Sequence, residues 1–197
     1  MKKLMIFVTL LLSLLAINPS WARVNVNVGI SLPAIVFAAP PEVIVLPDSD
    51  DVYVVPDIDV DIFFWSGWWW REWEGRWYRS QYYDRGWGYY RSVPSFYFDV
   101  DPGWRAYYRN YDWYGHRWNY ERIPYQRLHK NWSGWHKGRH WERQGTWGVQ
   151  GYKLRPQRQR QELRQQRQKQ YQQRPEVQKH QQFHKSNSQG KMRQQRP

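Results

Sequence analysis

The sequence contains no cysteine, so neither a disulfide bond nor thiol chemistry is available to the protein. It also has no GxSxG nucleophile motif, no Gly-rich phosphate loop and no HExxH pair, the patterns that would indicate hydrolase, nucleotide or zinc-protease chemistry. After residue 22 no apolar run is long enough to cross a bilayer. These absences predict a non-enzymatic protein with no catalytic residue, no cofactor and no transmembrane span in its mature chain.

The first 22 residues have the layout of a secretory signal peptide. Two lysines follow Met1, residues 4–17 are mostly apolar, and Ser20-Trp21-Ala22 places small residues at the −3 and −1 positions of a cleavage site. We predict cleavage after Ala22 and export to the periplasm or cell envelope, or secretion. An uncleaved anchor is the alternative, but the apolar run is shorter than the roughly 20 residues that a span needs.

The net charge of +13 is unevenly distributed along the chain. Residues 153–197 hold thirteen basic and two acidic residues, a net +11, whereas residues 23–152 hold fifteen of each. Within that neutral part, residues 23–66 carry −6 and residues 67–152 carry +6. We therefore expect the acidic and basic halves of the neutral part to pair with each other, and the excess positive charge to belong to the tail.

An antiparallel meander of short strands is predicted from about residue 52 onward. Gly-bearing turns at Ser66-Gly67, Glu74-Gly75 and Arg85-Gly86 separate β-branched and aromatic segments. We expect these to be type I turns followed by a bulge. The predicted strands are 52–55, 58–65, 68–73, 76–83 and 87–91.

Residues 23–51 are punctuated by proline. Residues 24–28 alternate between valine and asparagine, which predicts a half-buried strand. Prolines flank the apolar runs 35–37 and 43–46. Because proline removes a donor from the ladder, these two runs predict edge strands or extended linkers, not central strands.

Two short helices are predicted after the meander. Asp101-Pro102 is typical of a helix start, and the aromatic residues from Trp104 to Tyr111 recur at helical spacing. The second helix is predicted to begin at Pro124, with Ser133-Gly134 as a point where it breaks or kinks.

From Arg155 onward Gln, Arg and Lys dominate the composition. Leu163, Tyr171, Val177 and Phe183 are too sparse to bury an ordered core, although Gln and Arg are good helix formers. The tail is therefore expected to be disordered or a single helix over 157–173, with disorder in isolation preferred.

The predicted fold class is α+β, mainly β: an antiparallel meander of short strands with two short helices, followed by a low-complexity tail. The predicted organisation is a signal peptide (1–22), a Pro-punctuated extended segment (23–51), a Trp/Tyr-rich meander with helices (52–152) and a Gln/Arg-rich basic tail (153–197).

Tryptophan is unusually frequent, with fourteen of the fifteen residues lying between Trp65 and Trp147. Such rings supply the core of a domain that has little Leu or Ile. Alternatively, exposed rings of the meander form a platform that binds a glycan or a partner protein. The ligand-stacking candidates are Trp68, Trp69, Trp70, Trp73, Trp77 and Tyr78.

No metal site is predicted, although the weak candidates His129, His136 and His140 recur at spacings that one helix face could present to Zn²⁺ or Cu²⁺. The aspartates that alternate from Asp57 to Asp61 would lie along one extended strand. Since one strand cannot direct six to eight oxygens at a Ca²⁺ ion, these carboxylates are expected to be solvated or paired with arginine.

The basic tail predicts a binding function. A flexible polycation binds polyanions through counterion release, and outside the cytoplasm these would be anionic envelope polymers or lipid headgroups, without specific nucleic-acid recognition. The polyanion-binding candidates are Arg155, Arg158, Arg160, Arg164, Arg167, Lys169 and Arg174. We therefore expect a structural or interaction protein of the envelope, with glycan binding and His-mediated metal binding as alternatives.

Two stretches carry a resemblance. They are residues 54–64, VVPDIDVDIFF, running into 75–80, GRWYRS, and residues 113–118, WYGHRW. They resemble a group of uncharacterised exported Trp/Tyr-rich proteins of Geobacter-like Gram-negative bacteria that have Gln/Arg-rich tails. The chain is also loosely similar to exported proteins with YXWGXW repeats, although it has no intact copy of that repeat. The resemblance implies the compartment and the architecture, and it implies no site residue.

Overall fold

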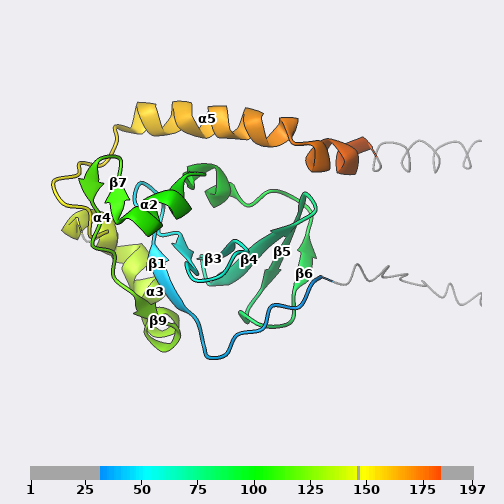
Figure 1. Cartoon of the computed structure of the whole chain (residues 1–197), viewed down its shortest axis with the longest axis horizontal. Helices are drawn as coiled ribbons and strands as arrows, with labels where there is room; N and C mark the ends of the chain where they lie inside the picture. Colours follow the sequence, from blue (N-terminus) through cyan, green and yellow to red (C-terminus); the bar gives the residue numbers. More distant parts are fainter. Residues whose placement is uncertain (1–31, 146, 183–197) are drawn as a thin grey trace, which may run out of the picture. The chain divides into compact units, whose positions relative to one another are not determined.

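A computed structural model describes residues 32–145 and 147–182. The chain divides into two units, Met1–Pro33 and Ala34–Pro197, and every described helix and strand lies in the second unit (Figure 1). The strand expected at 24–28 lies outside the described residues.

Seven short strands form one antiparallel sheet in the order β6-β5-β4-β3-β2-β1-β9. The strands of the sheet are β1 (Glu42–Val45), β2 (Tyr53–Val54), β3 (Ile62–Trp65), β4 (Trp68–Trp73), β5 (Arg76–Ser80), β6 (Gly88–Tyr90) and β9 (Ile123–Pro124). Neighbours from β1 to β6 are consecutive in sequence and antiparallel, so the predicted meander is confirmed. A separate hairpin pairs β7 (Asp112–Trp113) with β8 (His116–Arg117).

Two-residue turns close the central hairpins. Ser66 and Gly67 have φ values of 50° and 80°, and Glu74 and Gly75 have 49° and 70°. Positive φ at both central residues defines a type I′ turn, whose twist matches that of the strands it joins. The expected type I turn with a bulge is therefore wrong at both positions. At Gly67 a side chain would also collide with Trp132, since an added Cβ would lie 2.7 Å from its ring.

Two other strand predictions need correction. The predicted strand 58–65 begins only at Ile62, because the chain turns and bends at residues 56–60. Asp57 in this turn pairs with Arg122, and Asp61 after it pairs with Arg105. The run at 43–46 is not an edge, because β1 pairs with β2 on one side and β9 on the other. Its flanking prolines lie outside the strand and leave the ladder donors intact. Residues 35–37 form no strand.

The described helical elements are η1 (Ser95–Asp99), α2 (Trp104–Asn110), α3 (Tyr125–Gly138), α4 (His140–Gln144) and α5 (Gln157–Gln173). The two predicted short helices correspond to α2 and α3. α3 continues through Ser133-Gly134 without a break. Asp101 lies just before α2, where its carboxylate accepts the Gly103 N–H at 2.8 Å.

Both faces of the sheet are covered by aromatic packing. On one face Trp69 stacks on Tyr125 of α3, and the indole N–H of Trp141 in α4 donates to the Tyr53 hydroxyl at 2.7 Å. On the other face Trp70 packs against Phe96 of η1. The buried tryptophans are Trp69, Trp70, Trp77, Trp104, Trp113, Trp118, Trp141 and Trp147. Tryptophan therefore supplies the largest buried side chains of the core, beside valine, isoleucine, leucine and other aromatic residues.

The tail is expected to be either disordered or a single helix. The structure has the helix, α5, over residues 157–173, drawn in yellow to orange in Figure 1. α5 contacts η1. Its Tyr171, together with Val177 beyond it, forms a small buried cluster with Phe98. Two of the sparse apolar residues of the tail, Tyr171 and Val177, are thus buried because η1 supplies a partner from a distant part of the sequence. Residues 175–182 are again helical.

Candidate functional sites: the basic tail and a His–Asp cluster

The arginines on one side of α5 point into the body of the protein. Arg164 pairs with Asp99, and Arg167 pairs with Asp101 at 2.6 Å. Arg167 also donates to the Asp99 carbonyl at 3.0 Å. Burial raises the pKa of Asp99, against the opposing hydrogen bond from Arg164. Without its guanidinium partner this carboxylate would therefore be poorly accommodated.

Arginines that flank α5 at its two ends also pair with carboxylates of the body. After the helix, Arg174 bridges Glu72 of β4 at 2.9 Å and Glu176 at 2.6 Å. Burial raises the pKa of Glu72, and the hydrogen bond from Arg174 opposes that shift. Before the helix, Arg155 lies 3.3 Å from Asp48 and its guanidinium lies 4.1 Å from the centre of the Tyr114 ring.

The seven polyanion-binding candidates therefore fall into two groups. Arg155, Arg164, Arg167 and Arg174 pair with carboxylates of the body. Arg158 is exposed and pairs with Glu162 one turn along α5, Lys169 is exposed, and Arg160 is half-buried. The solvent-facing side of α5 consequently carries little net positive charge.

The most one-sided stretch of charge in the tail lies beyond α5. Residues 179–197 contain five basic residues and no acidic residue. Of these, Lys179 lies within the described part of the chain, where its side chain is exposed. The basic tail is thus divided into a segment that pairs with the body and a segment whose sequence has no carboxylate of its own.

The acidic and basic halves of the body pair as predicted. Asp57 binds Arg122 at 2.6 Å, and Asp61 binds Arg105 at 2.6 Å. Hydrogen bonding from Arg122 lowers the pKa of Asp57, with a further contribution from the Tyr108 hydroxyl. Two aspartates of the predicted row, Asp57 and Asp61, are therefore paired with arginine, as expected, and do not converge on a cation.

The ligand-stacking candidates do not share one open face. Trp69, Trp70, Trp77 and Tyr78 are buried, and only Trp68 and Trp73 are half-exposed. Since residues 68 and 73 differ by an odd number, their side chains point to opposite faces of β4. Trp68 is also covered by the Arg79 guanidinium, 4.4 Å from its ring centre.

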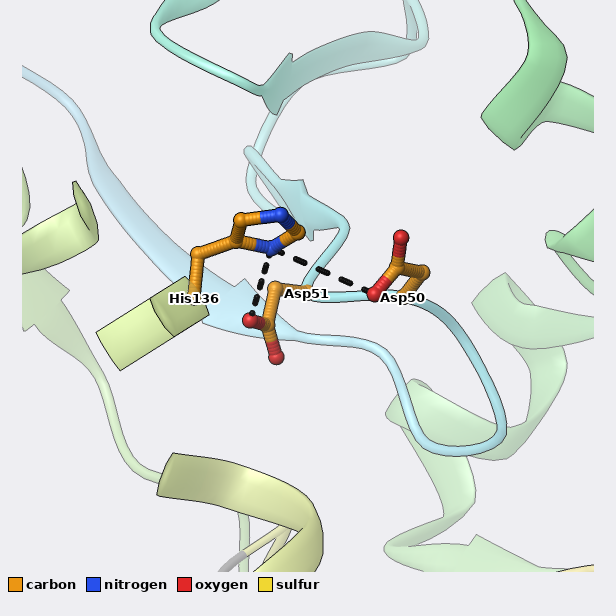
Figure 2. A group of neighbouring side chains, drawn as sticks. All are labelled: Asp50, Asp51 and His136. Atoms are coloured by element: carbon orange, nitrogen blue, oxygen red, sulfur yellow. Dashed lines mark hydrogen bonds and ion pairs between the residues drawn. The ribbon is translucent and has the colours of Figure 1, made fainter. Parts of the chain in front are cut away.

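The three predicted histidines are separated from one another. His129 packs against Tyr125, and His140 stacks on Trp135 with the rings 20° apart. His136 instead faces two aspartates that sequence analysis did not connect with it (Figure 2). Those aspartates lie 85 and 86 residues away along the chain, in the loop between β1 and β2, so the spacing of nearby residues could not indicate this cluster.

This His–Asp cluster consists of Asp50, Asp51 and His136. His136 Nδ1 lies 3.2 Å from Oδ2 of Asp51 and 4.0 Å from Oδ1 of Asp50. The Asp51 side chain is 12% exposed, whereas Asp50 and His136 are open to solvent. Burial raises the pKa of Asp51, and the neighbouring charge of Asp50 raises it further, while His136 acts in the opposite direction.

No family model, curated protein or solved structure matches this chain. The resemblance to Trp/Tyr-rich exported proteins therefore stays a prediction. Among residues 32–145 and 147–182, no helix combines the length and the apolar character that a membrane crossing requires.

Proposed function

We propose that this chain is a non-enzymatic, exported protein of the cell envelope whose C-terminal segment, residues 179–197, binds anionic envelope polymers. In this proposal α5 holds the segment to the aromatic body, and the paired arginines of α5 are structural. The proposal moves the polyanion-binding residues from the arginines of α5 to Lys179, Lys185, Lys191, Arg193 and Arg196.

The observation that supports this proposal is the unequal pairing of the basic residues. Four arginines between residues 155 and 174 pair with carboxylates of the body. Using these arginines to bind a polymer would leave partly buried carboxylates such as Asp99 and Glu72 without partners, which costs about 1–3 kcal/mol for each group. Residues 179–197, by contrast, contain five basic residues and no carboxylate.

Counterion release supplies the driving force. A cationic segment that engages a polyanion displaces its condensed counterions, so affinity falls steeply as the salt concentration rises. Five positive charges in nineteen residues make such binding sensitive to salt and insensitive to the sequence of the polymer. An anionic polysaccharide of the envelope meets this requirement without a shaped pocket.

The test compares three forms of the mature chain for binding to heparin, a soluble anionic polysaccharide, at low and high salt. In the first variant the five basic residues of 179–197 become glutamine, and binding should fall at least tenfold. In the matched control, five exposed basic residues outside this segment become glutamine, namely Lys130, Lys137, Arg143, Arg158 and Lys169, and binding should change less than threefold. Equal losses in both variants, or salt-independent binding, would overturn the proposal.

Export is tested separately. The proposal expects the mature protein recovered from the envelope fraction of its host to begin at Arg23, as shown by intact mass and N-terminal sequencing. An uncleaved chain retained in the cytoplasm would rule out the exported part of the proposal, while leaving the heparin result to be judged on its own.

A further inference from the structure

The His–Asp cluster is built on a loop that hydrogen bonds hold in one conformation. The Ser49 hydroxyl donates to the Leu46 carbonyl at 2.6 Å and accepts the Val52 N–H at 3.2 Å. The indole N–H of Trp65 donates to the Asp50 carbonyl at 3.0 Å. The two carboxylates are therefore presented by a backbone with little freedom, which is what a preorganised site requires.

The opposite side of the cluster is rigid as well. His136 lies in the last turns of α3, a helix of 14 residues whose Leu128 is fully buried. Its Nδ1 faces the carboxylates (Figure 2). One ligand atom from each of Asp50, Asp51 and His136 lies within 4.8 Å of the other two.

These separations suit a metal ion of the zinc class. Bonds of about 2.0–2.2 Å from imidazole nitrogen and carboxylate oxygen place neighbouring ligand atoms roughly 3–4 Å apart. The distances from His136 Nδ1 to Asp51 and Asp50 are 3.2 and 4.0 Å. An imidazole ligand favours Zn²⁺, Cu²⁺ or Ni²⁺ over Ca²⁺ and Mg²⁺, which take oxygen ligands.

The charges of the cluster also favour a cation. Within the described part of the chain, the ion pairs of Asp50 and Asp51 are formed with His136 alone. The nearby Glu142 is paired with Arg139. Within the described residues no arginine or lysine forms an ion pair with these two carboxylates, and Arg139 acts on them at longer range, whereas Asp57 and Asp61 each pair directly with an arginine.

We propose that Asp50, Asp51 and His136 bind a divalent transition-metal ion such as Zn²⁺, with water completing its coordination. The three ligands join the loop between β1 and β2 to the C-terminal half of α3. The bound ion would cross-link two segments that are distant in sequence, in a protein that has no cysteine to form a disulfide bond.

The test is a calorimetric titration of the mature chain with Zn²⁺. His180 and His184 lie four residues apart in the tail and could bind Zn²⁺ themselves, so the parent protein carries His180→Gln and His184→Gln. We expect one binding site, an affinity at least tenfold lower in His136→Gln, and less than a twofold change in the control His129→Gln. Ca²⁺ at the same concentration should not compete.

Asp51→Asn provides a second, independent variant. Asp51 has a φ of 50°, a left-handed conformation that asparagine also adopts readily, so the loop should keep its shape while the ligand charge is lost. Zn²⁺ affinity should fall at least tenfold, with the near-ultraviolet circular dichroism of the tryptophans unchanged. No binding to the parent, or binding in His136→Gln and Asp51→Asn that is as tight as in the parent, would show that the cluster is an ion pair only.

Discussion

The aromatic body and α5 are held in place by different interactions. In the body, Trp69 on one face of the sheet and Trp70 on the other are buried and contact other rings. α5 buries Tyr171 alone along its 17 residues and is otherwise held by arginines that pair with carboxylates of the body. The stability of the body should therefore depend on the volume of its buried aromatic side chains. The docking of α5 should depend instead on the single aromatic anchor Tyr171 and on the arginine–carboxylate pairs.

The comparison also separates arginines by role. Arg164 and Arg167 are surrounded by the same kinds of neighbours in sequence as Arg158, yet the first two contact the body and the third is exposed. What distinguishes them is the face of the helix on which they lie. A charge count over the tail therefore overstates the charge that is available to a partner.

The largest expected effect lies in the body. Trp69→Ala removes a fully buried ring from the sheet and should lower the free energy of unfolding by about 3–5 kcal/mol. Urea denaturation measures the change. The control Tyr82→Ala removes a half-exposed ring and should stay within about 0.5 kcal/mol. A similar loss in both variants would mean that the tryptophan core is not what stabilises the body.

Tyr171→Ala should release α5 while leaving the body folded. The Tyr171 side chain is buried, and its hydroxyl accepts the indole N–H of Trp77 at 3.0 Å. Burial of an aromatic side chain contributes about 1.5–3 kcal/mol, which is a tenfold or greater change in the undocked population. Trypsin cleavage within residues 158–169 should accelerate by that factor, but not in the exposed control Gln165→Ala. Unchanged cleavage in Tyr171→Ala would exclude Tyr171 as the anchor.

Arg167→Gln should have a smaller effect, because Asp101 keeps its hydrogen bonds from the Tyr114 hydroxyl and the Gly103 N–H. We expect a loss of about 1.5 kcal/mol, typical of one hydrogen bond to a charged group, measured by urea denaturation. Arg158→Gln, whose side chain is 92% exposed, should change stability by less than about 0.5 kcal/mol. If the two substitutions are equivalent, the paired arginines do not hold α5.

The smallest expected effect is the contribution of Asp57 to the pH dependence of the stability of the body. The pKa of Asp57 is lowered by Arg122, so its contribution to stability is present above the ordinary carboxyl value and is lost as pH falls through the lowered value. Asp57→Asn should remove this acid-sensitive contribution, which is under about 1 kcal/mol because the carboxylate is half-exposed. Denaturation curves between pH 2 and pH 7 test it. An unchanged acid dependence in the variant would contradict the assignment.

Sequence patterns predicted the hairpins and helices because these depend on neighbours in the chain. Gly67 and Gly75 marked the turns between β3, β4 and β5, and the aromatic spacing after Asp101 marked α2. The same patterns could not predict that β1 lies inside the sheet, since its second neighbour, β9, comes nearly 80 residues later.

The functional residues were harder to predict for the same reason. His136 was a weak candidate, but Asp50 and Asp51 become its neighbours only when the loop between β1 and β2 meets α3. The order of α5 likewise depends on Phe98, which no property of the Gln-rich sequence indicates. Both the His–Asp cluster and the order of α5 therefore depend on residues that are distant in sequence and become neighbours only in the folded protein.

The account depends most on α5 being docked in the full-length protein, with its inward-facing arginines paired. Amide hydrogen exchange of residues 157–173, followed by mass spectrometry, tests this directly. We predict protection at least tenfold above that of the unfolded chain, lost in Tyr171→Ala while the strands β3–β5 stay protected. Exchange of residues 157–173 at the unfolded-chain rate in the unmodified protein would contradict the account and return all the arginines of the tail to polymer binding.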